Sequence, residues 1–247
     1  MTRVVAFVLI LAAAFAAAAA VGQAVGPFER GAASPHAEEP EEQHAAGLSI
    51  ELVSGPSHRF RVLDEDGEPV EAFDVLHERP MHLIVVRRDL TGFMHLHPKL
   101  GRDGTWFVPL ALPEPGTWVA FADFSTGGER ATLATDLHTR GSFEPRPLPP
   151  PSRTAQAGPY RVELHADAGR LEFRVKREGR PVAVDRYLGA RGHLVILREG
   201  DLEYLHAHAE EDELAFETEF PSPGRYRLFL QFKASGSVRT AEFTVRQ

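Results

Sequence analysis

Apolar and polar side chains alternate along several short stretches of the chain. In RLEFRVK, residues 170–176, Leu171, Phe173 and Val175 fall on one side, and RYRLFLQFK at 225–233 follows the same pattern. Alternation with a period of two is typical of β-strands that have one buried face. Turn sequences such as DEDG, DLTG, GRDG and PSPG recur about every ten residues, as in a sandwich of short antiparallel strands. The pattern predicts an all-β protein.

The chain also repeats itself. EDGEPV at 65–70 matches REGRPV at 177–182, HLIVVRRDLTGFMHLH at 82–97 matches HLVILREGDLEYLHAH at 193–208, and LPEPGTW at 112–118 matches FPSPGRY at 220–226. The blocks keep nearly the same separation, which chance similarity does not produce. We therefore predict two tandem immunoglobulin-like or cupredoxin-like β-sandwich domains, at 48–140 and 159–247.

Three further segments flank these domains. Residues 1–25 carry one cation, Arg3, followed by an uncharged apolar run, which predicts a hydrophobic helix that is a transmembrane anchor or a cleaved signal peptide. Either one places the rest outside the cytoplasm, in a single-pass protein of the cell membrane or in a secreted protein. Residues 26–47 are acidic and poor in large apolar side chains, which predicts a disordered tether. Residues 141–158 are Pro-rich and predict a semi-rigid linker.

Composition narrows the function classes. The net charge of −8 argues against nucleic acid as a partner, because phosphate binding needs clustered Lys and Arg. The chain has no cysteine, so disulfides and thiolate metal sites are excluded. It also lacks the G-x-S-x-G, phosphate-loop and H-E-x-x-H motifs. We predict a protein that is not an enzyme.

Each copy of the repeat contains the same histidine pattern, H-x12-H-x-H. The two sets are His82, His95 and His97, and His193, His206 and His208. Hairpins centred on 89–90 and on 200–201 would bring the first histidine of each set opposite the third, with the second beside them on the same face. Opposed residues have Cβ atoms about 5 Å apart, so three imidazoles can converge on one metal ion.

The first copy offers additional ligands near this site. His77 and Glu78 precede the first strand of the hairpin, and Asp123 follows the start of a later strand; the second copy has Leu188, Gly189 and Gln231 instead. We therefore expect the first copy to bind metal more tightly than the second. The alternative is that these histidines are hydrogen-bonded side chains that an ancestral duplication copied.

The block HLIVVRRDLTGF-x-HLHP resembles bacterial membrane-anchored or secreted proteins of unassigned function, similar to YtkA-like and other cupredoxin-like domains of copper-handling envelope systems. The resemblance implies a β-sandwich and a link to copper or heavy-metal homeostasis. Imidazole ligands suit copper and zinc. We expect an extracytoplasmic metal-binding envelope protein. The alternative is a structural immunoglobulin-like module that docks a membrane or envelope protein partner without metal.

Overall fold

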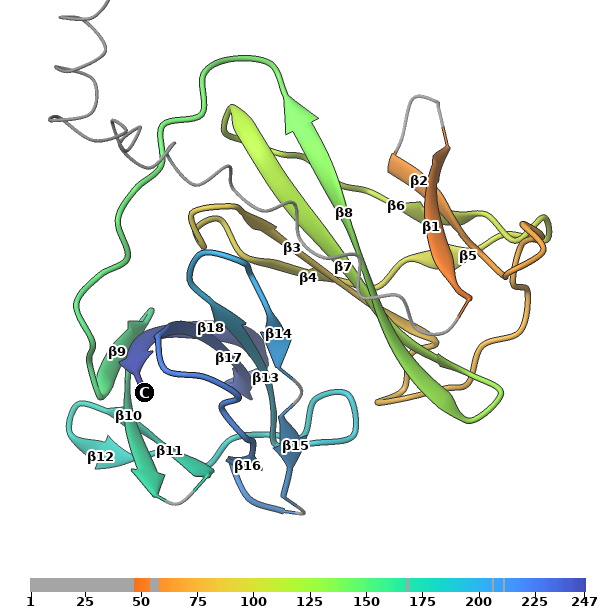
Figure 1. Cartoon of the computed structure of the whole chain (residues 1–247). Helices are drawn as coiled ribbons and strands as arrows, with labels where there is room; N and C mark the ends of the chain where they lie inside the picture. The colour runs from red at the N-terminus through yellow and green to blue at the C-terminus, as the bar shows by residue number, and fades with distance from the viewer. Residues whose placement is uncertain (1–46, 54–57, 168, 206, 211) are drawn as a thin grey trace, which may run out of the picture. The chain divides into compact units, whose positions relative to one another are not determined.

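The computed structural model describes residues 47–53, 58–167, 169–205, 207–210 and 212–247. All of them belong to one compact unit, Glu39–Gln247. They form strands connected by turns, with no helix among them (Figure 1). The predicted hydrophobic helix at 1–25 lies outside the described residues, as does nearly all of the predicted tether. Within the described part of the chain, no helix is long and apolar enough to cross a membrane.

The first copy of the repeat consists of two four-stranded antiparallel sheets. The strand order of one sheet is β1 (Ser49–Val53), β2 (His58–Leu63), β6 (Trp106–Val108) and β5 (Lys99–Leu100). The order of the other is β4 (Met94–Leu96), β3 (Met81–Arg87), β7 (Gly116–Thr126) and β8 (Glu129–Thr139). Each hairpin therefore stays in one sheet, and the chain changes sheets between hairpins.

The second copy repeats this arrangement and adds edge strands. Its first sheet runs β15 (His208–Ala209), β16 (Ala215–Glu217), β11 (Arg170–Arg177), β10 (Tyr160–Asp167) and β9 (Thr154–Ala157), with β12 (Arg180–Pro181) also paired to β11. Its second sheet runs β14 (Tyr204–Leu205), β13 (Gly192–Arg198), β17 (Arg225–Ala234) and β18 (Ser237–Arg246). The all-β fold and the internal repeat are confirmed.

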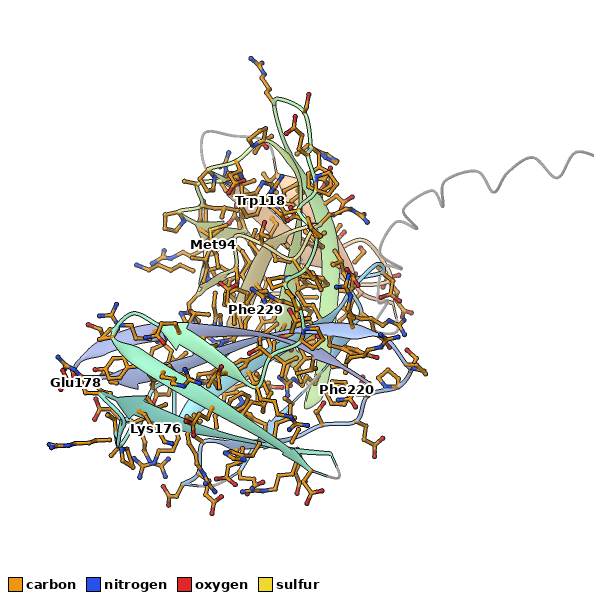
Figure 2. The ribbon with its side chains drawn as sticks, turned by 90° about the vertical axis from the view of Figure 1, so that its left-hand side faces the viewer. Met94, Trp118, Lys176, Glu178, Phe220 and Phe229 are labelled. Atoms are coloured by element: carbon orange, nitrogen blue, oxygen red, sulfur yellow. The ribbon has the colours of Figure 1, made fainter. Side chains whose placement is uncertain are left out.

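The topology of each copy is that of an immunoglobulin-like sandwich, with strands A, B, E and D in one sheet and C′, C, F and G in the other. A side chain at the start of the F strand bonds back to the chain four residues upstream. The Tyr226 hydroxyl donates to the Ser222 carbonyl at 2.7 Å, and Trp118 Nε1 donates to the Glu114 carbonyl at 3.1 Å. This is the tyrosine corner of such folds, with tryptophan in its place in the first copy. Both aromatic side chains are fully buried, and Trp118 is labelled in Figure 2.

The β4-β3-β7-β8 sheet is buried on both faces. All seven residues of β3 are buried, which a half-exposed strand would not show. Met81, Leu83 and Val85 face the interior of their own sandwich. The alternate residues Ile84 and Val86 belong to a second core shared by the two copies. That core consists of Ile84, Val86, Leu90, Val119, Phe121, Ala134, Leu148, Val195, Leu197, Leu202 and Phe229.

Contacts in this shared core are reciprocal. Phe93 of the first copy stacks on Phe229 of the second, with ring centroids 4.3 Å apart and an interplanar angle of 9°. Tyr204 and Phe121 are the equivalents of Phe93 and Phe229 with the copies exchanged. Their ring centroids are 5.5 Å apart. The same surface of each copy therefore contacts the other, as in an isologous dimer interface.

The Pro-rich segment at 141–158 is more than the spacer that its composition predicts. Leu148 is buried in the shared core, and the backbone N–H of Arg146 donates to the Asp89 carboxylate at 3.0 Å. The same carboxylate oxygen accepts from Arg87 at 3.0 Å, and both side chains of this pair are buried. The buried ion pair of Arg87 and Asp89 thus connects the β3–β4 turn to the linker, whose Leu148 belongs to the shared core.

Replacing Phe229 with alanine removes one ring of the stacked pair and leaves a cavity between the copies. We expect the Phe229→Ala variant to lose about 3–5 kcal/mol of unfolding free energy, measured by urea denaturation. Phe107→Ala is the matched control, because Phe107 is 39% exposed, and should cost less than about 1 kcal/mol. Equal losses in the two variants would contradict a stabilising shared core.

Replacing Asp89 with alanine leaves the Arg87 guanidinium buried without its closest carboxylate. We expect a loss of about 3–5 kcal/mol of unfolding free energy in Asp89→Ala. The second copy supplies the control, since Asp201 pairs with Arg198 in the equivalent turn but is 37% exposed. Asp201→Ala should cost less than about 1 kcal/mol. A smaller loss for Asp89→Ala than for Asp201→Ala would refute the role assigned to the buried pair.

Candidate metal centre

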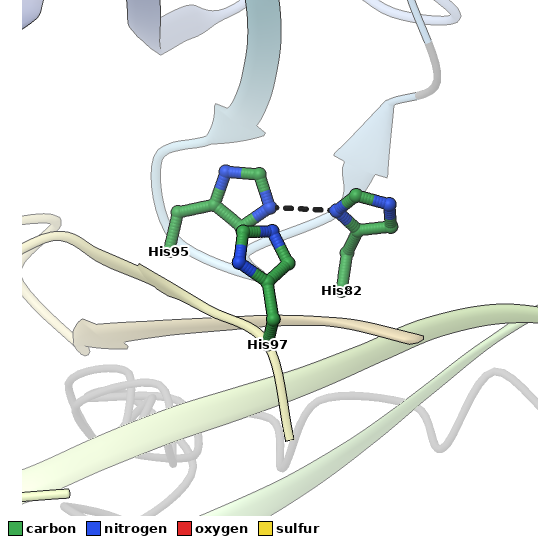
Figure 3. Close-up of side chains that lie close together, drawn as sticks. All are labelled: His82, His95 and His97. Carbon is green, nitrogen blue, oxygen red and sulfur yellow. Dashed lines mark hydrogen bonds between the residues drawn. The ribbon is translucent and has the colours of Figure 1, made fainter. Parts of the chain in front are cut away.

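His82, His95 and His97 converge as the hairpin register predicts. The β3–β4 ladder pairs Leu83 with Leu96 and Ile84 with His95, so its continuation places His82 opposite His97. His95 lies on the same face because side chains two residues apart share a face of a strand. Figure 3 shows the three rings facing one another. The strand itself ends at Leu96, so His97 extends from the residue that follows β4.

The spacing of the three rings suits a metal ion. Ring centroids are 5.1 Å apart for His82 and His95, 5.1 Å for His82 and His97, and 4.8 Å for His95 and His97. One ring nitrogen from each residue lies within 4.8 Å of the others. Metal–nitrogen bonds of about 2.0–2.1 Å in tetrahedral geometry put imidazole centroids about 5 Å apart. The three side chains therefore have the spacing of ligands around one ion.

A tight turn fixes the tautomer of His82. Nε2 of His82 lies 3.1 Å from the Leu76 carbonyl oxygen, which can only accept, so Nε2 carries the proton. In neutral His82 the other nitrogen, Nδ1, is therefore an unprotonated acceptor. The turn that presents this carbonyl has His77 and Glu78 at φ values of 48° and 63°. Such values are rare for residues other than glycine, and strained backbone of this kind is concentrated at functional sites.

A side chain of the second copy fixes the tautomer of His95. Nδ1 of His95 lies 2.7 Å from Oε1 of Gln231, whose amide nitrogen lies 3.4 Å from the Thr240 hydroxyl. With the amide in this orientation, His95 donates from Nδ1, so Nε2 of the neutral ring is bare. That atom is 2.9 Å from the bare Nδ1 of His82. Two lone pairs thus face each other at hydrogen-bonding distance with no proton between them.

Burial keeps these imidazoles neutral. Desolvation, with the neighbouring His82, lowers the pKa of His95 to about 3. Desolvation, with His82 and Arg79, lowers the pKa of His97 to about 4, and burial also lowers the pKa of His82. Nε2 of His97 is buried and has no hydrogen-bond partner among the described residues. Neutral imidazole is the form that binds metal.

The second copy contributes His193 to the same place. His193 is equivalent to His82, and its Nε2 donates to the Tyr187 carbonyl at 2.9 Å, as His82 donates to Leu76. Its ring lies 5.9 Å from that of His95 and 6.1 Å from that of His82. His193 and the first triad therefore share one site between the copies.

The backbone pairing of His208 differs from the predicted hairpin. The β13–β14 ladder ends at Ile196 and Leu205, and His208 pairs with Glu217 of β16 in the other sheet. The predicted pairing of His193 with His208 is therefore wrong, because the chain changes sheets directly after this short hairpin. His206 lies outside the described residues, and only the backbone of His208 is described.

The accessory residues have different surroundings. Asp123 is the cross-strand neighbour of His82, but its carboxylate receives two hydrogen bonds from Arg130, at 2.9 and 3.2 Å. The ring of His77 lies 5.3 Å from that of His193 at the exposed edge of the site. Glu78 is exposed and does not line the cavity there.

A small cavity, about 50 Å³ in volume, lies beside His82, His95 and His193, and His97 does not line it. Its polar lining comes from both copies: His77, His82, His95, Asp123, Arg130, His193 and Tyr204. Gln231 is the functional residue that sequence reasoning did not assign to the site. Its signal is its place opposite His193, which is the place that Asp123 has opposite His82.

Comparison with known proteins gives a family but no activity. No curated protein matches the chain. The match to a family model gives no support to the YtkA-like resemblance and instead identifies the domain of unknown function DUF8832, at residues 45–141 and again at 155–247. The two matched segments contain the two immunoglobulin-like copies described above. The chain therefore belongs to the DUF8832 family and carries its domain twice.

Proposed function

We propose that this protein binds a divalent metal ion, copper or zinc, through His82, His95 and His97, as an extracytoplasmic envelope protein in metal homeostasis. The observation that carries the proposal is the pair of bare nitrogens, His82 Nδ1 and His95 Nε2, at 2.9 Å. Facing lone pairs repel unless a cation lies between them. Nε2 of His97, buried without a described partner, is the third donor.

A metal ion satisfies this arrangement better than a proton. A shared proton would require a cationic imidazole pair, and a pKa of about 3 for His95 makes that form scarce at neutral pH. Bonds of about 2.0–2.1 Å to nitrogens 2.9 Å apart correspond to an angle near 90° at the metal, so a small opening of the rings reaches tetrahedral geometry. The rings need little rearrangement because the Leu76 carbonyl and Gln231 already orient them.

The size of the cavity favours binding over catalysis. Pockets for small-molecule ligands have volumes of about 300–1,000 Å³. The cavity at the histidines is about 50 Å³, which accommodates an ion with a water molecule but not an organic substrate. We therefore propose a role in holding or delivering metal rather than in chemical conversion.

Copper and zinc are each supported by a different argument. Cu(II) binds nitrogen ligands more tightly than the other divalent ions of its series, whereas the tetrahedral spacing of the rings is the geometry of zinc sites and Cu(II) prefers tetragonal ones. The apolar run in residues 1–25 supports a location at the cell membrane as a single-pass protein with both copies outside, or secretion after cleavage.

Removing two of the three ligands should abolish the site. We expect the wild-type protein to bind one equivalent of Cu(II) or Zn(II) in isothermal titration, and the His95→Ala/His97→Ala double variant to bind at least 100-fold more weakly. His138→Ala/His165→Ala is the control, because these two exposed histidines lie away from the cavity. It should bind as the wild type does.

The same titration separates the proposal from the docking-module alternative. A structural immunoglobulin-like module that only docks an envelope partner would take up no stoichiometric metal. Unchanged binding in the His95→Ala/His97→Ala variant would show that the metal lies elsewhere and would end the assignment of the first triad.

The neutral imidazoles also make the stability of the metal-free protein depend on pH. An unfolded histidine has a pKa of about 6.5. The folded pKa is about 3 for His95 and about 4 for His97 and His193. Between these pKa values the unfolded chain binds more protons than the folded protein. The contribution of these neutral histidines to the unfolding free energy is therefore fully present above about pH 6.5 and decreases as the pH falls toward about 4.

We expect the urea midpoint of the chelator-treated protein to decrease between about pH 7.5 and about pH 5, and to decrease less in His95→Leu, which removes one of the titrating groups. His165→Leu, which changes an exposed imidazole, should keep the wild-type dependence. The same pH dependence in His95→Leu as in the wild type would contradict a neutral, buried His95.

A further inference from the structure

We propose that His193 of the second copy is the fourth protein ligand of the ion held by His82, His95 and His97, so that the metal joins the two copies of the repeat. The inference rests on the proposed metal function and adds to it the residue that closes the site. It also assigns to Gln231 the role of positioning His95 from across the interface between the copies.

The hydrogen bond of His193 leaves one of its ring nitrogens available to bind a metal ion. Its Nε2 proton is engaged by the Tyr187 carbonyl at 2.9 Å, which leaves Nδ1 unprotonated. His82 is held in the same way by the equivalent turn of the first copy. Both copies thus present an imidazole with the same tautomer to the shared cavity.

The distances show a preformed triad and a fourth ring just outside it. Centroids within the triad are 4.8–5.1 Å apart, close to the spacing of about 5 Å expected for tetrahedral imidazole ligands. The centroid of His193 is 5.9 Å from that of His95 and 6.1 Å from that of His82. A movement of this ring toward His82 and His95 would bring it to the same spacing from both. His193 is therefore the ring whose approach completes four-coordinate geometry.

Other candidates for the fourth position are less suitable. The Asp123 carboxylate is bound by Arg130 through two hydrogen bonds, so its use as a ligand would break an ion pair. His77 is exposed, and its ring lies nearer to His193 than to His82. His193 would not have to break an ion pair to bind, because Nε2 already donates to the Tyr187 carbonyl and Nδ1 is unprotonated.

The ion would then stabilise the interface between the copies. First-copy ligands come from β3 and the end of β4, and the fourth comes from β13, on the other side of the shared core. Binding to the folded protein alone stabilises it by mass action, and a bridging ion directs that stabilisation to the contact between the copies.

The test measures the affinity and the coordination of Co(II), Zn(II) and Cu(II) in the full-length protein. His193→Leu keeps an apolar side chain of similar size at the interface, and His165→Leu is the matched control, on an exposed face of the same copy. We expect one ion per wild-type chain, a Co(II) absorption spectrum of four-coordinate type, and binding at least tenfold weaker in His193→Leu. In the smaller His193→Ala, added imidazole should restore both the affinity and the spectrum, which a purely structural role would not allow.

The outcomes separate the two proposals. Metal binding with unchanged affinity and spectrum in His193→Leu would overturn the bridging ligand and leave the triad intact. Weaker binding without a change in the Co(II) spectrum, and without rescue by imidazole, would also overturn it, because His193 would then only support the fold. A wild-type protein that binds no metal would overturn both proposals at once.

Discussion

The structure depends on the burial of both faces of the sheet that contains β3 and β7, and of its counterpart with β13 and β17. One face of each sheet fills its own sandwich, and the other packs against the equivalent face of the other copy. Burial of apolar side chains from water drives this packing, and the stacked rings of Phe93 and Phe229 give it a defined geometry. Because His82, His95 and His193 lie on these same outward faces, the contact between the copies determines what surrounds each of these imidazoles.

Polar groups at such an interface must find partners or lose stability. The outer nitrogens of His82 and His193 are satisfied by backbone carbonyls, and Gln231 satisfies one nitrogen of His95. These bonds leave Nδ1 of His82 and Nε2 of His95 bare and 2.9 Å apart, and they leave Nδ1 of His193 unprotonated. Neighbouring neutral imidazoles cannot relieve this by taking up protons, because burial and mutual repulsion lower their pKa values. A cation at the proposed site would resolve the conflict without adding a polar group that needs its own partner.

The sequence is sufficient to predict the fold and the first-copy histidines of the site. Period-two alternation and turn spacing predict the sandwiches, and the hairpin register predicts that His82 and His97 lie opposite each other, as the β3–β4 ladder confirms. The runs MHLIVV and HLVIL are continuously apolar rather than alternating, which indicates strands that are buried on both faces. They do not indicate that the second face of each sheet is covered by the other copy. Gln231 could not be assigned from sequence, because its partner is 136 residues away on the other copy. The position of His208 depends on where a short strand ends, which local pattern does not determine.

Duplication within one chain allows equivalent positions to differ. Asp123 and Gln231 occupy the same place in the two copies, each opposite the first histidine of its set. Asp123 is engaged by Arg130 within its own copy, whereas Gln231 reaches across to orient His95. An identical pair of chains would have to place the same residue at both positions, and an aspartate at 231 would bring a carboxylate against His95. The neutral amide orients that ring and favours its protonation less than a carboxylate would. The asymmetry therefore lets the first copy supply the triad while the second copy holds His95 in the tautomer that the proposed metal site requires.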